Sequence, residues 1–217
     1  MAAPLDDPGT HSRLARSLWV PILRGIVRAI FWILGPLEVR GAYRVPKTGP
    51  VLILANHISD LDPVLAQYAC PRLVYFLAKR ELFDMPGVGL ATRLHHVIPV
   101  NRGEADRQAL RLAMKRLRES EPVVIFPEGQ LSEDGELQEI KRGFSLVLRE
   151  TEAPILCLGI QGANRVLPYG SLWLRPAFRR IVLTWGEPRS FSKETPWEEL
   201  ESWVQSELRN LSGAREV

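Results

Sequence analysis

The sequence predicts an α/β fold, in which a mixed, largely parallel sheet is flanked by helices and preceded by an N-terminal amphipathic helical segment. Two observations predict the sheet. Short runs of almost only apolar residues recur along the chain, and segments with helical periodicity separate them. The third observation is size, because 217 residues with 46% hydrophobic and 24% charged side chains can form one packed domain.

Apolar runs and helix-like segments alternate from residue 50 to the end of the chain. Predicted strands occupy residues 50–55, 73–78, 97–100, 123–126, 154–160 and 180–185, and predicted helices occupy residues 63–69, 104–119 and 144–149. The last helix is expected to begin with Thr195 as its N-cap and Pro196 at its first position. Its apolar stripe is Leu200, Val204, Leu208 and Leu211.

Residues 1–12 predict a flexible tail, and residues 13–37 predict a helical segment with affinity for membranes. Four arginines share one face of that helix, opposite the aliphatic side chains: Arg13, Arg16, Arg24 and Arg28. No apolar run is long enough to span a bilayer, and Pro21 is expected to kink or restart the helix. Arginines opposite an apolar face are typical of a helix lying in a membrane interface. The alternative is an ordinary amphipathic helix packed on the body.

The net charge of +3 originates near the N-terminus. Residues 11–47 contain seven cationic side chains and one acid, so the remaining chain is almost neutral. A nucleic-acid-binding body would need a basic face, so we expect no nucleic-acid partner and a membrane phospholipid surface instead. Cys70 and Cys157 lie in apolar surroundings, which disfavours a disulfide or a zinc site and favours a reducing compartment.

The first candidate site directly follows the predicted strand 50–55 and reads Asn56-His57-Ile58-Ser59-Asp60-Leu61-Asp62-Pro63. In α/β folds, functional groups favour the ends of strands. Asp62 can orient the imidazole of His57, which then acts as a general base toward a hydroxyl group. The alternative is that Asp62 only caps a helix beginning at Pro63.

The remaining candidate residues also follow predicted strands or begin a helix. Glu128 and Gly129 could bind substrate hydroxyls or form an ordinary Pro-Glu-Gly turn. Arg102 could bind a phosphate through its planar guanidinium or form a surface salt bridge. Lys141 and Arg142 are a basic pair where a helix begins.

A metal-hydrolase cluster of His57, Asp60, Asp62 and Glu128 is an alternative interpretation. No second histidine lies at ligand spacing nearby, so we expect no metal. The sequence also lacks the Gly-x-Ser-x-Gly elbow of serine hydrolases and the glycine-rich loops that bind nucleotides.

Together these motifs resemble those of the glycerolipid acyltransferase family, which includes 1-acyl-glycerol-3-phosphate (lysophosphatidate) acyltransferases. NHISDLD matches the family's Asn-His-x4-Asp motif at Asn56, His57 and Asp62. VIPVNR resembles the second block, with its arginine at Arg102, and FPEG at residues 126–129 matches the third. The resemblance covers residues 35–190, with 153–162 in place of the fourth block, so residues 38–217 are expected to form the acyltransferase domain.

The resemblance implies transfer of a fatty acyl group from acyl-CoA or acyl-carrier protein to the free hydroxyl of a lysophospholipid. His57 would be the general base and Asp62 would hold it, without a metal or any cofactor besides the thioester co-substrate. The implied substrate-binding residues are Asn56, Glu128, Gly129, Arg102, Lys141 and Arg142, the cations lying near the acceptor phosphate. The expected location is the cytoplasmic face of the cell membrane, as a monotopic or peripheral protein.

One departure from the family pattern leaves the acceptor open. The third block usually continues Thr-Arg-Ser, whereas this sequence has Gln130-Leu131-Ser132. The family arginine is often assigned to the acceptor phosphate, so lysophosphatidylethanolamine is an alternative acceptor, and the acidic loop 133–139 would suit its amine. Two further hypotheses are a non-catalytic membrane lipid-binding protein and a thioesterase-like hydrolase.

Overall fold

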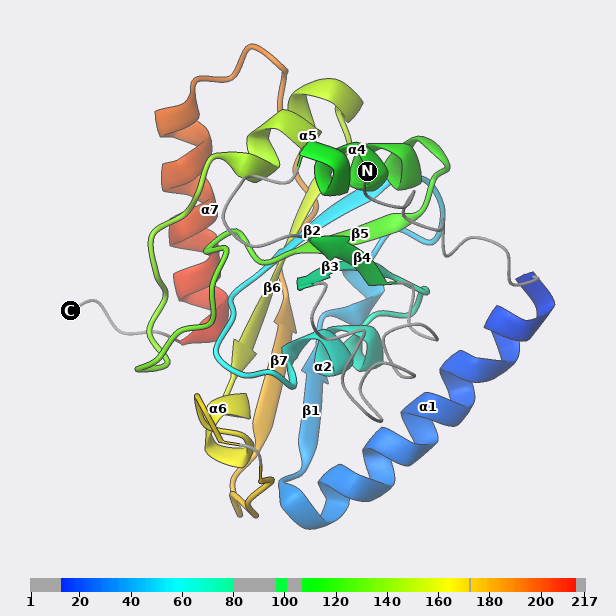
Figure 1. Cartoon of the computed structure of the whole chain (residues 1–217), viewed down its shortest axis with the longest axis vertical. Coiled ribbons are helices and arrows are strands. Elements are labelled where there is room, and N and C mark those ends of the chain that lie inside the picture. Colours follow the sequence, from blue (N-terminus) through cyan, green and yellow to red (C-terminus); the bar gives the residue numbers. More distant parts are fainter. Residues whose placement is uncertain (1–12, 80–96, 101–106, 172, 214–217) are drawn as a thin grey trace, which may run out of the picture.

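In the part of the chain that the structure describes, a seven-stranded sheet forms the centre, and helices cover both of its faces (Figure 1). The computed structural model describes residues 13–79, 97–100, 107–171 and 173–213. The expected tail at residues 1–12 and the candidate Arg102 lie outside the described residues. The fold is the α/β class predicted from the sequence.

The sheet is mixed and largely parallel. Its strands are β1 (Leu37–Arg40), β2 (Val51–Ala55), β3 (Tyr75–Lys79), β4 (Val97–Val100), β5 (Pro122–Ile125), β6 (Ile155–Gln161) and β7 (Ile181–Trp185), in the spatial order β1-β7-β6-β2-β5-β3-β4. All neighbouring strands pair in parallel except β6 and β7, which are antiparallel. The five strands from β6 to β4 in this order therefore run in one direction and place their carboxyl ends at one edge.

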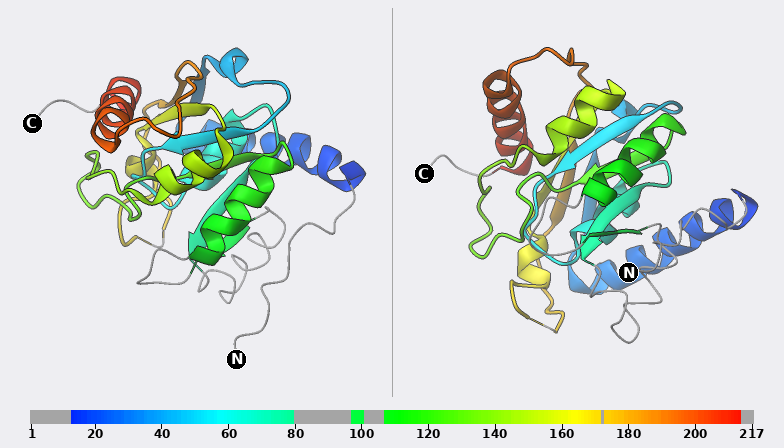
Figure 2. Two further views of the ribbon diagram at one scale, coloured as in Figure 1. Left: turned by 90° about the horizontal axis from the view of Figure 1, so that it is seen from above. Right: turned by 45° about the horizontal axis from the view of Figure 1, so that its top comes forward.

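The helices form two layers, one on each face of the sheet (Figure 2). They are α1 (Arg13–Leu34), α2 (Asp62–Ala69), α4 (Arg107–Arg118), α5 (Gly143–Thr151), α6 (Ala163–Val166) and α7 (Trp197–Ser212), with a short 3-10 helix, η2 (Ala42–Arg44). Buried side chains of α1, α2 and α6 join one hydrophobic core, and those of α4, α5 and α7 join the other.

The position of β2 in the middle of the sheet explains why its sequence is uniformly apolar. Val51 and Ile53 contribute to the core beneath α2, whereas Leu52 and Leu54 contribute to the core beneath α5. Since every β2 residue is buried, neither face has a place for a polar side chain. The first polar residues after β2 therefore mark the edge of the sheet.

The structure differs from the sequence predictions at several places. The edge strand β1 was missed because its residues are half-buried or exposed and form no apolar run. The helix α1 continues through Pro21 without restarting. The expected Thr195 cap is wrong, because α7 begins at Trp197 after Pro196 and has no side-chain hydrogen bond at its cap.

The helix α1 presents an unexpected face to the body of the protein. Val27 and Phe31 are buried against the core, and the Arg24 guanidinium donates a hydrogen bond to the carbonyl oxygen of Cys70. The arginine face is thus partly turned inward, and the opposite side exposes an aliphatic stripe: Ile22, Ile26, Ile30 and Ile33. Among the described residues, no helix is long and apolar enough to cross a membrane.

We predict that Gly159→Ala destabilises the fold through the contact between β6 and α7. A Cβ atom at residue 159 would lie 2.3 Å from the backbone carbonyl carbon of Leu211, so the helix would have to move away. Overpacking of this kind costs about 1–3 kcal/mol, which urea denaturation would measure.

The matched control is Gly143→Ala at the start of α5, where an added Cβ meets no atom within 4 Å. This change should leave the unfolding free energy unchanged or raise it by up to about 1 kcal/mol. Equal unfolding free energies for the two variants would contradict the close approach of α7 to the sheet.

Candidate functional site

The candidate site lies at the edge where the parallel strands end. His57 follows the carboxyl end of β2, and Glu128 follows that of β5. These two strands are paired neighbours, with Leu54 opposite Ile125, so the loops that follow them meet. The topology therefore brings together two motifs that lie 71 residues apart in the sequence.

Asp62 holds His57 through one side-chain oxygen. Its Oδ2 lies 3.0 Å from His57 Nδ1 and accepts hydrogen bonds from the backbone N–H groups of Ile58 at 2.7 Å and Ser59 at 2.8 Å. The carboxylate thus faces the preceding turn and not the start of α2, whose cap has no side-chain hydrogen bond. The alternative of a simple helix cap is therefore wrong for Asp62.

Burial is the dominant influence on Asp62. The residue is completely buried, and its Oδ1 has no hydrogen-bond partner among the described residues. Loss of hydration raises the pKa of Asp62, whereas the His57 contact and the two backbone N–H groups oppose that rise. The hydrogen bonds to Oδ2 are what favour the ionised form at this depth.

The backbone and ring of His57 are fixed on several sides. Its N–H donates to Glu128 Oε1 at 2.8 Å, and its carbonyl oxygen accepts from the Ser132 N–H at 2.8 Å. The ring stacks on Phe126 with centroids 4.2 Å apart and planes 20° from parallel. Since Nδ1 contacts Asp62, Nε2 is the ring nitrogen that can contact a bound molecule. The His57 side chain is 17% exposed.

Glu128 is a buried residue that binds the backbone of the site. The residue is completely buried, and its second oxygen, Oε2, accepts a hydrogen bond from the Gln138 N–H at 2.9 Å. Burial raises the pKa of Glu128 to about 7, although the N–H groups of Gln138 and His57 lower it. Both carboxylate oxygens are occupied by backbone groups, so the geometry makes Glu128 a positioning residue rather than a direct substrate ligand.

Asn56 also has a positioning geometry. Its side-chain nitrogen donates to the carbonyl oxygen of Ile160 at 2.9 Å, and its side-chain oxygen accepts from the N–H of Ile160 at 2.7 Å. The amide is buried and extends the pairing of β2 with β6 beyond Ala55. The expectation that Asn56 binds substrate directly does not fit this arrangement.

Gly129 and Lys141 lie together, whereas Arg142 lies elsewhere. Gly129 has a φ of +67°, and a Cβ there would lie 3.3 Å from Lys141 Nζ, so the lysine crosses the space that a side chain would fill. Arg142 is directed to α7, where its guanidinium lies 5.3 Å from the Trp197 ring centroid and 3.8 Å from Glu198. The structure therefore does not bring Arg142 into the site.

Three residues of the site were missed from the sequence. Phe126 lies under the imidazole, Ser132 binds the His57 carbonyl, and Gln138 binds Glu128. Ser132 and Gln138 act here through backbone N–H groups, which every residue type except proline carries, so residue identity offers no signal. Among the described residues, no group of three or more histidine, cysteine, aspartate or glutamate side chains is arranged to hold a metal.

Comparison with known proteins places this site in a family. The family model described as Acyltransferase matches residues 36–161, which is more than half of the chain and includes every residue of the site. The chain belongs to the acyltransferase family.

The solved structures and curated sequences agree with this acyltransferase assignment. The crystal structure of the 1-acyl-sn-glycerophosphate (LPA) acyltransferase PlsC from Thermotoga maritima is 25% identical, has a TM-score of 0.77, and is matched over 93% of this chain and 82% of that chain. The 1-acyl-sn-glycerol-3-phosphate acyltransferase of Borreliella burgdorferi is 31% identical over 66% of this chain and 58% of its own length.

A human relative, 1-acyl-sn-glycerol-3-phosphate acyltransferase alpha, is 32% identical over 62% of this chain and 49% of its own length. The chain thus spans about half the length of the curated relatives it matches.

We predict that Glu128 makes the stability of the acyltransferase fold fall as pH rises from about 4.5 to about 7. The native state keeps a proton on Glu128 up to about pH 7, whereas the unfolded chain releases it near 4.5, so the native state binds more protons in this window. The corresponding loss is about 3 kcal/mol in unfolding free energy. Urea denaturation at several pH values would measure it.

Glu128→Gln is the comparison variant. It removes the titrating group and leaves one of the two backbone N–H groups facing an amide nitrogen, so it should be less stable at every pH. Relative to this variant, the wild-type protein should show the extra decline between pH 4.5 and 7. Parallel stability curves for the two proteins would refute the raised pKa.

Proposed function

We propose that this protein transfers an acyl group from an acyl thioester to the free hydroxyl of lysophosphatidate. The observation that carries the proposal is the His57–Asp62 pair, with Nδ1 and Oδ2 3.0 Å apart at the carboxyl edge of the sheet. Membership of the acyltransferase family and the names of the matched relatives support the same chemistry.

The proposed reaction uses His57 Nε2, because Nδ1 contacts Asp62. His57 Nε2 takes the proton of the acceptor hydroxyl as the oxygen attacks the thioester carbonyl carbon. The tetrahedral intermediate then breaks its carbon–sulfur bond, and the leaving thiolate takes the proton from the imidazolium. An ester and a free thiol result, and Asp62 stabilises the imidazolium between the two steps. Because a thioester is already activated, one base and correct positioning suffice, and the proposal includes no metal or further cofactor.

The loops around His57 supply the positioning. Glu128 and Ser132 hold the two backbone polar groups of His57, and Phe126 covers one face of its ring. Such constraints keep Nε2 in one place, which matters because misplacement of a reacting atom by about 1 Å can cost about a hundredfold in rate.

We propose that Lys141 and Arg102 bind the acceptor phosphate. Lys141 Nζ lies over Gly129, on the loop segment that leads to Ser132 and the His57 carbonyl. Arg102 follows β4, whose carboxyl end points to the same sheet edge as β2 and β5. An ammonium and a guanidinium suit a phosphomonoester, which carries more negative charge than a phosphodiester.

The donor in this proposal is acyl-CoA or acyl-carrier protein, since both present the same thioester. We place the protein on the membrane surface, at its cytoplasmic face, with the exposed stripe of α1 toward the lipid. The free and buried Cys70 and Cys157 suit that reducing compartment.

A second acceptor, lysophosphatidylethanolamine, is favoured by one observation. The Tyr169 hydroxyl hydrogen-bonds to Glu133 and lies close enough to Asp60 for that charge also to raise the Tyr169 pKa. Asp60 lies in the His57–Asp62 turn, so two carboxylates border the site where an ammonium head group would be stabilised.

We predict that His57→Ala lowers acyl transfer by about 10²–10⁴-fold, because it removes the general base. Thiol release from acyl-CoA, with and without lysophosphatidate or lysophosphatidylethanolamine, would measure the activity. The variant should keep its circular dichroism spectrum and its binding to liposomes.

Several outcomes of this assay would contradict the proposal. Wild-type activity in the variant would exclude His57 as the base. Thiol release without any acceptor would indicate a hydrolase, and no release with either acceptor would favour a non-catalytic lipid-binding protein. Faster transfer to lysophosphatidylethanolamine would select the second acceptor.

We predict that Lys141→Ala raises the KM for lysophosphatidate by about tenfold or more, because a charge-assisted contact with the phosphate is lost. Arg142→Ala is the matched control, since it removes a neighbouring cation directed to α7. Steady-state kinetics should show little change in KM for the control. Equal effects of the two substitutions would mean that Lys141 contributes only general positive charge.

A further inference from the structure

The loop between α6 and β7 exposes several large apolar side chains that lie close together in the sequence. Trp173 is 80% exposed, Leu174 is 47% exposed and Phe178 is 85% exposed. Isolated exposed apolar residues are ordinary, but three within six positions, two of them aromatic, form a patch. Such patches mark surfaces that contact a protein, a ligand or a membrane.

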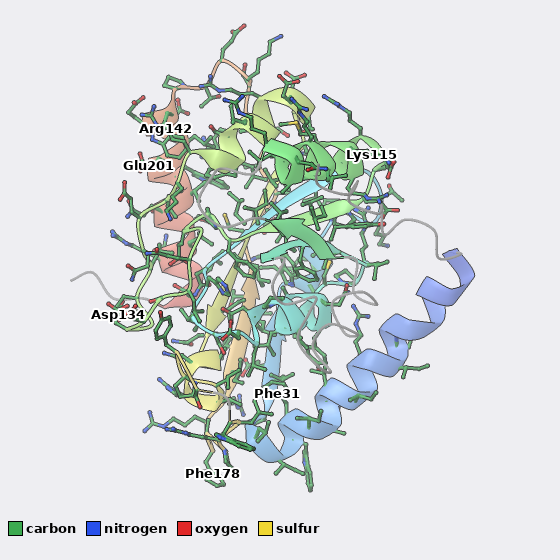
Figure 3. The ribbon with its side chains drawn as sticks, in the orientation of Figure 1. Phe31, Lys115, Asp134, Arg142, Phe178 and Glu201 are labelled. Atoms are coloured by element: carbon green, nitrogen blue, oxygen red, sulfur yellow. The ribbon has the colours of Figure 1, made fainter. Side chains whose placement is uncertain are left out.

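This loop is attached to the end of α1. The N–H of Ala177 donates to the carbonyl oxygen of Leu34 at 2.7 Å. A Cβ at Gly35 would lie 2.7 Å from the carbonyl oxygen of Arg179, so the two backbones touch. Phe178 lies between these two contacts, and Figure 3 shows it at the end of the molecule where α1 ends. The apolar loop therefore continues the region in which α1 exposes Trp32 and Ile33.

The backbone at Phe178 is strained. Its φ of 50° lies in the left-handed region, which bulky side chains rarely adopt. The chain keeps an exposed phenylalanine where glycine or asparagine would be easier to accommodate. Strain of this kind at an exposed position points to a function for the side chain that is directed outward.

The charge around the loop matches that of α1. Residues 162–181 contain four arginines and no acidic residue. Residues 13–37 also contain four arginines and no acidic residue. With a total of +3, the rest of the chain carries −5. Arg175 and Arg179 are exposed and form no salt bridge with any residue that the structure describes. Arginines beside exposed tryptophan and phenylalanine suit an anionic lipid surface, where phosphates bind the cations and the rings enter the interface.

The same loop begins at the candidate active site. The hydroxyl of Ser59, two residues after His57, donates to the carbonyl oxygen of Leu167 at 2.9 Å. Tyr169, two residues further along the loop, hydrogen-bonds to Glu133. One continuous segment thus connects the His57 turn with the apolar patch.

We propose that residues 173–178 are a second membrane-contact element, which docks with α1 on an anionic bilayer and places the His57 edge beside the lipid. The proposal rests on the membrane association proposed for α1 and commits to a lipid occupant because the apolar patch, its arginines and α1 are continuous. Two separate contacts fix the orientation of the protein on the surface, which a single helix does not.

Vesicle sedimentation with the full chain tests this proposal, using vesicles of phosphatidylcholine with phosphatidylglycerol and vesicles of phosphatidylcholine alone. Trp173→Ser/Phe178→Ser should weaken binding to the anionic vesicles by about tenfold. Tyr43→Ser is the matched control, because Tyr43 is an aromatic residue that is 83% exposed but lies away from α1. The strand β1 separates the two, since α1 precedes β1 and Tyr43 follows it. Binding of the control variant should equal that of the wild type. All the substituted residues are exposed, and equal thermal midpoints would show that the fold is retained.

Ile26→Ser/Ile30→Ser in α1 separates this inference from the proposal for α1. Loss of binding in both double variants supports two contacts. Loss only in the α1 variant overturns the role of the loop and leaves α1 as the single contact. Unchanged vesicle binding in both double variants overturns both membrane contacts. If the wild type is an oligomer and the loop variant loses both vesicle binding and that oligomer, the patch contacts a second copy of the chain instead.

Fluorescence quenching by phospholipids with brominated acyl chains provides a second readout. Trp173 should be quenched in the vesicle-bound protein, so Trp173→Phe should show a smaller quenched fraction of total emission while binding as tightly as the wild type. An unchanged quenched fraction would place residue 173 outside the bilayer and overturn the proposal.

Discussion

The site depends on one buried carboxylate oxygen. Asp62 Oδ2 receives the imidazole of His57 and two backbone N–H groups from the turn between them, so the same atom shapes the turn and orients the ring. Because Asp62 is completely buried, its charge is stable only while these contacts are present. Glu128 also binds backbone groups, since its two oxygens accept hydrogen bonds from the N–H groups of His57 and Gln138 and so connect the two segments. The site is therefore held by buried acids that bind backbone groups.

The sheet topology determines where these contacts can form. Parallel pairing of β2 with β5 and β6 places three carboxyl ends at one edge, and the loops after those strands contain His57, Glu128 and the segment that begins at α6. Two of these loops hold the site, and the third continues to the exposed Trp173 and Phe178 beside α1. This arrangement brings His57 and the exposed apolar side chains to connected loops, which suits the lipid acceptor and the membrane contact that we propose.

The sequence was sufficient for the fold class and for the strand-end motifs, because a strand buried on both faces can contain only apolar residues and the first polar residues then mark its end. The sequence was not sufficient to predict which way individual side chains face. The helical wheel grouped Arg24 with the other arginines, but only tertiary packing determines that Arg24 faces Cys70 while the isoleucines face outward. Likewise, Asn56 and Glu128 were recognised as important, but whether their polar atoms face a substrate or the backbone depends on partners 104 and 10 residues away.

In the proposed reaction, His57 acts as a base because Asp62 orients it. The most direct test is the turnover number of Asp62→Asn with acyl-CoA and lysophosphatidate, measured on protein whose unfolding midpoint shows that it is folded. The amide keeps the shape of the side chain but removes the charge that stabilises the imidazolium. We expect turnover to fall by at least about a hundredfold. Turnover within a few-fold of the wild type, in a folded variant, would contradict this role of Asp62.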